Sequence, residues 1–260
     1  MNGPSPAASG LPLRDRTVLV TRPEGGGELQ RRLEALGAQV LAVPATTIEW
    51  LPAAALDEAL AHLGAFAWAV FTSRNAVQAV VARLRQANRA PDALATLRLA
   101  AVGTATAEAL HARGLEVSVV PARFSAEGVL AAFRERADVA GTRVLYATAE
   151  GAADTLPAGL AALGAEVERV ACYRSVRDDS AAPALARAAG VADVVTLTAP
   201  STVAAWVAAA GDAARTVPVV SIGAVTTEAA RAAGLRVVAE ASPSTSEGLA
   251  DAVRRYFVSA

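Results

Sequence analysis

Short runs of β-branched and aliphatic residues alternate with longer runs in which apolar residues follow a helical period. The short runs are typical of buried strands and the long ones of amphipathic helices. Such alternation predicts parallel sheets that are covered by helices on both faces. The predicted strands are 17–20, 39–43, 67–71, 97–102, 116–120, 143–147, 166–171, 193–197, 218–222 and 236–239. The predicted helices are 28–36, 53–63, 74–86, 105–113, 126–137, 155–163, 181–189, 201–210, 226–233 and 247–257.

The chain also contains an internal repeat. Segment 101–133 recurs as segment 221–253 at a constant offset of 120, and 71–77 faces 197–203 at an offset of 126. The recurring positions of the first pair include Gly103/Gly223, Thr106/Thr226, Glu108/Glu228, Gly114/Gly234, Glu127/Glu247 and Gly128/Gly248. With about five strands in each copy, the repeat predicts two flavodoxin-like α/β lobes and a ligand-binding cleft between them.

Composition narrows the class of protein. A chain of 260 residues is long enough for two domains that each bury a core. The net charge of -1 and the lack of lysine give no sign of a nucleic-acid or membrane surface. No uncharged apolar run is long enough to cross a membrane. A single cysteine excludes an intramolecular disulfide and favours a cytoplasmic location. Residues 1–13 are predicted to form a disordered tail rather than a signal peptide.

Metal and covalent chemistry receive little support from the sequence. His62 and His111 stand alone on predicted helices, where surface histidines are more common than metal ligands. Cys172 lies on an apolar strand, which favours a small buried side chain over a nucleophile. Glycines 25–27 faintly resemble a phosphate loop, but their spacing favours a flexible turn.

Turns that carry hydroxyl groups or glycine follow several predicted strands and lead into helices. They lie at 21–23, 72–75, 103–104, 198–201 and 223–224. Helix amino termini present unpaired N–H groups and a partial positive charge, and open α/β sheets bind ligands at this edge. Each turn alone is better explained by helix capping. Their joint occurrence in both copies favours a site for a ligand with many carboxylates.

An ordered set of motifs runs along the chain at Val20-Thr21-Arg22-Pro23, Phe71-Thr72-Ser73-Arg74-Asn75-Ala76-Val77, 101–114, 163–174, 221–234 and Ser246-Glu247-Gly248-Leu249. This set resembles the uroporphyrinogen-III synthase family, which cyclises a linear tetrapyrrole. Each motif is degenerate, but together they cover nearly the whole chain from about residue 14, in the family's order.

The resemblance implies an interleaved α/β fold of two flavodoxin-like, three-layer lobes with parallel sheets. One lobe would contain 14–44 and 176–260, and the other 48–171. Hinge strands at 44–48 and 171–175 would form a two-stranded connector that lets the lobes of a monomer open and close.

The implied reaction needs no cofactor and no metal. Hydroxymethylbilane loses its terminal hydroxyl, and the last pyrrole ring inverts as the macrocycle closes to uroporphyrinogen III. A hand-off of the bilane from hydroxymethylbilane synthase is compatible with this resemblance. Tyr173 would help the hydroxyl to leave, although packing as a connector aromatic explains this residue equally well. The implied substrate-binding residues are Arg22, Thr72, Ser73, Asn75, Gly103, Thr104, Ser125, Thr198, Ser201, Gly223, Thr226 and Thr227.

Two departures from the family pattern leave an alternative open. Ala199 stands where many relatives carry serine, and Thr148-Ala149 with Ala153 occupy a predicted loop where relatives often carry arginine. A catalytically inactive, two-lobed ligand-binding homologue is therefore the alternative. A periplasmic solute-binding protein and a two-lobed glycosyltransferase are disfavoured, because neither a signal peptide nor a nucleotide-binding signature is found.

Overall fold

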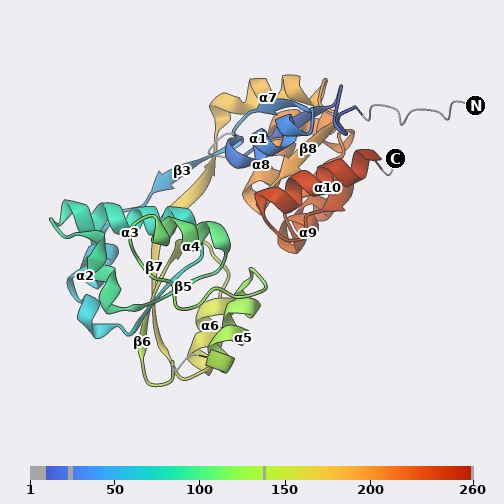
Figure 1. Ribbon diagram of the computed structural model, residues 1–260. Coiled ribbons are helices and arrows are strands. Elements are labelled where there is room, and N and C mark those ends of the chain that lie inside the picture. The colour runs from blue at the N-terminus through green and yellow to red at the C-terminus, as the bar shows by residue number, and fades with distance from the viewer. Residues whose placement is uncertain (1–9, 23–25, 137–138, 259–260) are drawn as a thin grey trace, which may run out of the picture. The chain divides into compact units, whose positions relative to one another are not determined.

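The computed structural model describes residues 10–22, 26–136 and 139–258 (Figure 1). Most of the predicted tail, part of the turn at 21–23, part of the glycine run at 25–27 and the predicted helix end at 137 lie outside these ranges. Within them the chain divides into two compact units. Unit 1 contains the described residues up to Thr47 and from Ser175 onward, and unit 2 contains Ile48–Arg174. The chain passes from one unit to the other within β3 (Thr46–Trp50) and again within β7 (Glu166–Arg177).

Unit 1 is a parallel sheet with helices on both faces. Its strands are β1 (Thr17–Val20), β2 (Gln39–Ala42), β8 (Val194–Leu197), β9 (Val219–Ser221) and β10 (Val237–Glu240), in the spatial order β2-β1-β8-β9-β10. All four strand pairs are parallel. This is the flavodoxin order. One face packs against α7 (Ala182–Ala189), α8 (Pro200–Ala210) and α9 (Ala224–Ala232), and the other against α1 (Gly27–Ala35) and α10 (Ser246–Val258).

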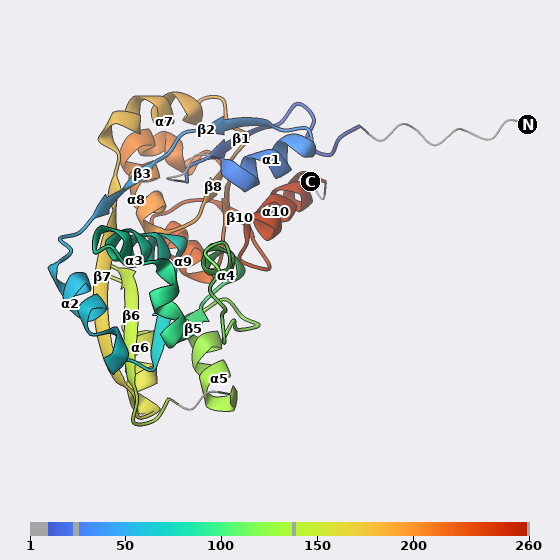
Figure 2. The same ribbon diagram turned by 60° about the vertical axis from the view of Figure 1, so that its left-hand side comes forward.

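Unit 2 has the same strand order if β4 (Trp68–Phe71) is counted as the first strand and β3 (which comes earlier in the chain) as the fifth. Its remaining strands are β4, β5 (Arg98–Ala101) and β6 (Arg143–Ala149), in the order β5-β4-β6-β7-β3. The helices α2 (Ala54–Ala61), α3 (Arg74–Gln86) and α4 (Thr104–His111) cover one face. The helices α5 (Ala126–Arg136) and α6 (Thr155–Ala162) cover the other (Figure 2). The strand that is fifth in space, β3, is thus first in sequence.

The predicted fold class of two α/β lobes is confirmed, with one correction to the sheet of unit 2. That sheet is mixed rather than purely parallel. Strand β3 brings the chain into the unit and its neighbour β7 takes it out again, so these two adjacent strands do not share one direction. Just after β3, Leu51 N donates a hydrogen bond of 3.1 Å to Cys172 O of β7.

Several predicted elements differ from the observed ones. The predicted strand 116–120 is only an isolated bridge between Ala100 and Val119, because Ser118 N and Val119 N both donate to Leu99 O and no regular ladder continues. The predicted helix 53–63 ends at Ala61 and is followed by a 3₁₀ turn, Leu63–Ala65. Leu13, within the predicted tail, is fully buried, and its N–H donates to Leu36 O. Other 3₁₀ turns are Pro91–Thr96, Asp179–Ala181 and Gly211–Arg215.

The repeated Glu-Gly pair has a packing role in both units. Gly128 in the first turn of α5 and Gly248 in the first turn of α10 each contact the loop that precedes the helix. A Cβ on Gly128 would lie 2.0 Å from Arg123 O, and one on Gly248 would lie 2.0 Å from Pro243 O. Both loops therefore fold back so closely that only glycine fits in each helix.

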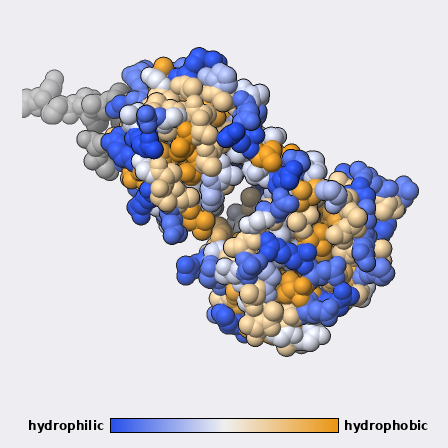
Figure 3. All heavy atoms as spheres, turned by 180° about the vertical axis from the view of Figure 1, so that it is seen from behind, coloured by the Kyte–Doolittle hydropathy of each residue, from blue (hydrophilic) through white to orange (hydrophobic). Residues whose placement is uncertain are grey.

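The surface carries mixed polar and apolar side chains. In the view of Figure 3, hydrophilic residues cover much of both units and hydrophobic residues form scattered patches. The large apolar side chains that are exposed among the described residues are Leu11, Trp50, Val120, Val191, Val225 and Val258. Within the described residues, no helix is long and apolar enough to cross a membrane.

Candidate active site

In unit 2, Tyr173 and Ser73 meet at the carboxyl edge of the sheet. Ser73 follows β4 and is the N-cap of α3, where its Oγ accepts a 3.1 Å hydrogen bond from Ala76 N. The phenol of Tyr173, from β7, donates to the same Oγ over 2.8 Å. Residues 100 positions apart are thus joined because the carboxyl end of β4 and the distal part of β7 lie at one edge.

The surroundings of Tyr173 keep its hydroxyl protonated. The side chain is only 8% exposed, and burial is the main cause that raises the pKa of its phenol above the usual value. The Ser73 hydroxyl and the Asn75 amide oppose this rise in pKa. The ring of Trp50 packs edge-on against the Tyr173 ring, with 6.2 Å between centroids. Tyr173 therefore remains a neutral hydrogen-bond donor at physiological pH.

A second group of hydroxyls lies at the end of β6. Thr148 Oγ1 donates to the Tyr146 hydroxyl over 3.2 Å and lies 3.4 Å from Thr72 Oγ1. Thr148 and Ala149 are the last residues of β6, so their predicted loop position was wrong. The strand period places Thr148 on the buried face beside Tyr146, and Thr148 is fully buried. Of the positions that depart from the family pattern, Thr148 and Ala149 therefore lie at the end of a strand, and only Ala153 lies in the loop that follows.

The remaining candidates of unit 2 lie near the starts of α3, α4 and α5. Gly103 is the N-cap residue, and no described side chain caps this helix. The loop before α5 lies against it, because a Cβ on Gly103 would be 3.7 Å from Phe124 Cβ. Ser125, in that loop, accepts from Gly128 N and so caps α5. Thr104 is exposed in the first turn of α4, while Asn75 and Thr72 are partly exposed near Ser73.

In unit 1 the carboxyl edge has a related arrangement. Gly223 precedes α9, which no described side chain caps, and a Cβ on Gly223 would lie 2.8 Å from Ser244 Oγ. Arg22 Nη1 donates to Ser246 Oγ over 2.8 Å at the start of α10. At α8, Thr198 N donates to Thr202 Oγ1, and Ser201 Oγ donates to Ser175 Oγ over 3.3 Å. In each unit a helix that follows glycine without a side-chain cap, α4 or α9, thus lies beside the loop that leads into the next helix, α5 or α10.

Two predicted residues of unit 1 have buried side chains. Thr226 and Thr227 belong to the first turns of α9, and both are buried. The Thr227 hydroxyl donates to the Glu240 carboxylate and lies 2.5 Å from Ser221 Oγ. Its hydrogen-bonding capacity is used within the unit, joining α9 to β9 and β10. A direct contact between these threonines and a ligand stays a prediction.

Sequence reasoning missed Trp50 and Tyr146. Trp50 ends β3 and is 48% exposed, although it packs against Tyr173. Its neighbours in sequence give no periodic signal, since the partner ring is on another strand far along the chain. Tyr146 lies on β6 in an apolar run that indicates only a buried strand. No local pattern reveals that its hydroxyl meets Thr148.

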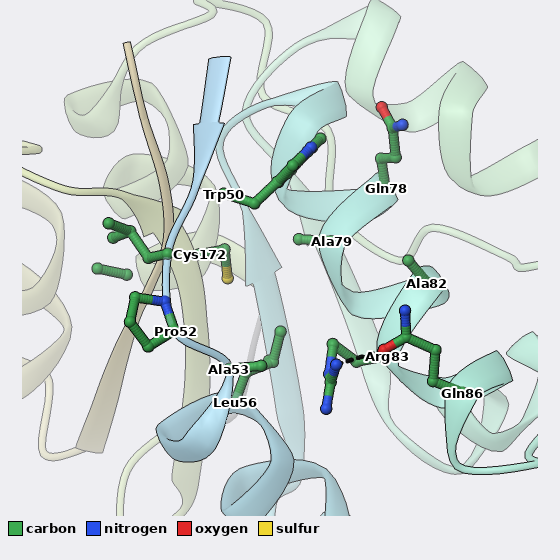
Figure 4. A pocket seen from close by; sticks show the side chains of 12 residues that line it. Trp50, Pro52, Ala53, Leu56, Gln78, Ala79, Ala82, Arg83, Gln86 and Cys172 are labelled. Atoms are coloured by element: carbon green, nitrogen blue, oxygen red, sulfur yellow. Dashed lines mark hydrogen bonds between the residues drawn. The ribbon is translucent and has the colours of Figure 1, made fainter. Parts of the chain in front are cut away.

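A cavity of about 320 Å³ lies beside Trp50 within unit 2 (Figure 4). Trp50 and Gln78 lie at one end, and Leu56, Arg83 and Gln86 at the other. The Arg83 guanidinium is already paired with Asp57, whose pKa is lowered by that hydrogen bond. The cavity therefore offers apolar contacts and neutral amides rather than an available positive charge.

Cys172 lines this cavity but is not prepared for nucleophilic chemistry. The side chain is buried, as predicted, and burial raises the pKa of its thiol to about 11. At pH 8 about one thiol in a thousand is then ionised, against about one in four for an exposed cysteine. We expect no reaction of the native protein with a disulfide reagent such as DTNB at pH 8, and release of one equivalent after denaturation. Native reaction at the rate of an exposed cysteine would contradict this.

The described residues contain no cluster of three or more histidine, cysteine or acidic side chains that could hold a metal. His62 and His111 are exposed on separate helical segments, as ordinary surface residues are. The chemistry that the described groups can perform is hydrogen bonding to anions and proton donation from a phenol.

Comparison with known proteins agrees with these features. The family model described as "Uroporphyrinogen-III synthase HemD" matches residues 27–251. The uroporphyrinogen-III synthase of Synechococcus elongatus is 35% identical over 63% of this chain and 62% of its own length. The porphyrin biosynthesis protein HemD of Ruminiclostridium josui is 30% identical over 89% of this chain. The chain spans only 47% of that longer protein.

Solved structures support the fold. A uroporphyrinogen III synthase of Thermus thermophilus superposes with a TM-score of 0.65 at 19% identity, covering 94% of this chain and all of the other. The synthetase of Helicobacter pylori gives a TM-score of 0.62 at 17% identity, covering 91% of this chain and 97% of the other. Since the family model also spans both units without interruption, the chain belongs to the uroporphyrinogen-III synthase family.

Proposed function

We propose that this chain converts hydroxymethylbilane into uroporphyrinogen III, with inversion of the last pyrrole ring and loss of water. The observation that carries the proposal is the continuous family match over residues 27–251. The retained polar groups at the carboxyl edge of each sheet favour this activity over that of an inactive ligand-binding homologue.

The substrate's carboxylates bind mainly to backbone amides. Helices α4 and α9 begin directly after Gly103 and Gly223 and lack side-chain caps among the described residues, so the N–H groups of their first residues are available to an anion. Thr104 supports these amides from an exposed position. Thr226 and Thr227 hold α9 in place rather than contacting the substrate, since both are buried. Further candidate contacts are Arg22, Thr72, Asn75, Ser125, Thr198 and Ser201.

Tyr173 promotes departure of the terminal hydroxyl. A proton passes to the leaving oxygen, the C–O bond breaks, and its electron pair leaves with the water molecule. The resulting azafulvene cation is attacked by a substituted carbon of the last ring, which rearranges through a spiro intermediate. A proton is released when the pyrrole regains its aromaticity, so the tyrosine is restored. The protein contributes chiefly by holding one folded geometry of the bilane.

The bilane closes in water without inversion of the last ring. The less time it spends free in solution, the more of it can be converted to the type III isomer. We therefore propose that hydroxymethylbilane synthase hands its product to this protein in the cytoplasm, and that the chain acts as a monomer. Elution as a single species of monomer mass on size exclusion with light scattering would support the second point.

The decisive measurement is the isomer formed. Bilane generated freshly by its upstream synthase is incubated with this protein, and the oxidised products are separated by chromatography. We expect type III to dominate, with type I in the control without protein. An isomer ratio equal to that of the control would leave the inactive homologue as the better interpretation.

A further inference from the structure

Ser73 occupies an unusual position between a buried phenol and the exposed edge of unit 2. Tyr173 is 8% exposed, and its proton is directed at Ser73 Oγ. Ser73 is partly exposed and begins α3. A ligand at the carboxyl edge therefore reaches the Ser73 hydroxyl more easily than the phenol behind it.

The hydrogen bonds that Ser73 accepts leave its hydroxyl able to act toward a ligand only as a donor. A serine oxygen has two lone pairs and one proton. Both lone pairs are used, one by Ala76 N–H at 3.1 Å and one by the Tyr173 O–H at 2.8 Å. The proton of Ser73 is then its remaining free group, and no acceptor for it lies within hydrogen-bond distance in the described part of the chain.

We propose that Ser73 is the catalytic residue that contacts the leaving hydroxyl and relays a proton to it from Tyr173. The inference rests on the proposed function and changes the expected role of Ser73, from a carboxylate ligand to a proton donor. Tyr173 then acts through Ser73 and does not need direct access to the substrate.

The relay balances in protons and electrons. The Ser73 O–H bond breaks as its proton joins the leaving oxygen, and the C–O electron pair departs with water. Ser73 Oγ takes the phenolic proton at the same time, so the charge change appears on Tyr173 as a phenolate opposite the azafulvene cation. The proton that the product pyrrole releases at ring closure returns along the same path and restores both hydroxyls.

The start of α3 assists this transfer. Ser73 caps a helix of 13 residues whose amino terminus carries a partial positive charge. Negative charge that develops on either hydroxyl is stabilised there, and the cap bond from Ala76 N holds the serine oxygen in place.

Three substitutions separate the relay from the helix cap. In Ser73→Asn the amide oxygen caps α3 as well as serine does, and the amide can donate a hydrogen bond but cannot pass on a proton. Ser73→Thr retains cap and hydroxyl, and Ser73→Ala removes both. Initial rates give kcat and KM, single-turnover rates are measured in mixtures of H₂O and D₂O, and thermal unfolding monitors the fold.

For Ser73→Asn we expect a native melting temperature, a KM within about 3-fold of the parent and a kcat lowered about 10- to 100-fold. Ser73→Thr should stay within about 3-fold of the parent in both constants. Adding Tyr173→Phe to Ser73→Asn should cost little more than either change alone, because both interrupt one path. In a plot of the single-turnover rate against the deuterium fraction of the solvent, the parent should give a curve, because two protons move in the same step. Ser73→Asn should give a straight line.

The proposal is overturned if Ser73→Asn turns over at the parent rate while Tyr173→Phe is slow, or if the parent shows a linear deuterium dependence. Those results leave the synthase assignment intact, since the type III isomer is still formed. Failure of the parent protein to form type III would instead reject the proposed function itself.

Discussion

Tyr173→Phe is expected to slow formation of uroporphyrinogen III by about 10- to 100-fold without changing which isomer forms. The substitution removes the one donor that reaches Ser73 Oγ from β7. The effect falls at the low end of what general acid catalysis contributes, because the bilane loses its hydroxyl without help and positioning supplies the rest. Rates of bilane consumption and the isomer ratio, measured on the same samples, test both parts.

The phenylalanine variant should remain folded. Its ring keeps the edge-on contact with Trp50, and Ser73 keeps the cap bond from Ala76 N. The raised pKa of Tyr173 adds a pH test: the parent should hold its activity above pH 10, the ordinary pKa of a tyrosine, as far as this group is concerned. Parent-like rates in a folded Tyr173→Phe protein would remove the proposed role of the phenol. Complete loss of activity would contradict the view that positioning dominates.

Gly248→Ala should lower the free energy of unfolding by about 3–5 kcal/mol, among the largest losses expected for a single methyl group. The added Cβ would lie 2.0 Å from Pro243 O, and a backbone carbonyl cannot move aside as a flexible side chain can. Gly128→Ala should behave alike in unit 2, because its Cβ would lie 2.0 Å from Arg123 O. Urea unfolding, followed by far-UV circular dichroism, measures the loss.

Gly64→Ala is the matched control for these variants. A Cβ at Gly64 would meet no atom within 4 Å, so this substitution should change stability by less than about 1 kcal/mol. If Gly248→Ala were as stable as Gly64→Ala, the loop before α10 would not be as tightly packed as described. The close contacts also explain why glycine recurs at these two positions of the repeat.

Elements with a clear local signal were predicted well. The helix predicted at 74–86 is observed as Arg74–Gln86, because Ser73 caps its first turn and apolar residues line one face. Gly114 and Gly234, which recur in the repeat, both have positive φ just after the ends of α4 and α9. The motifs additionally identified the family, which the family match confirms.

Features that depend on distant partners were not available from sequence. The run 116–120 has strand composition, yet two of its amides converge on Leu99 O and only a bridge forms. The joining of Tyr173 to Ser73, and of Thr227 to Glu240, depends on the order of strands in each sheet. Local periodicity specifies which residues are buried, but it does not specify which buried hydroxyls meet.

The strand order has a consequence for synthesis on the ribosome. Unit 2 is one continuous segment, so all of its strands have been made once Arg174 has been translated. Unit 1 cannot be completed then, because Val18 of β1 pairs with Val194 of β8, which is translated later. The first two strands must therefore wait, with one side of β1 unpaired, while the inserted segment folds first. Nascent chains arrested once all of unit 2 has emerged from the ribosome should resist proteolysis from Ile48 to Arg174 but remain open to cleavage in the preceding segment.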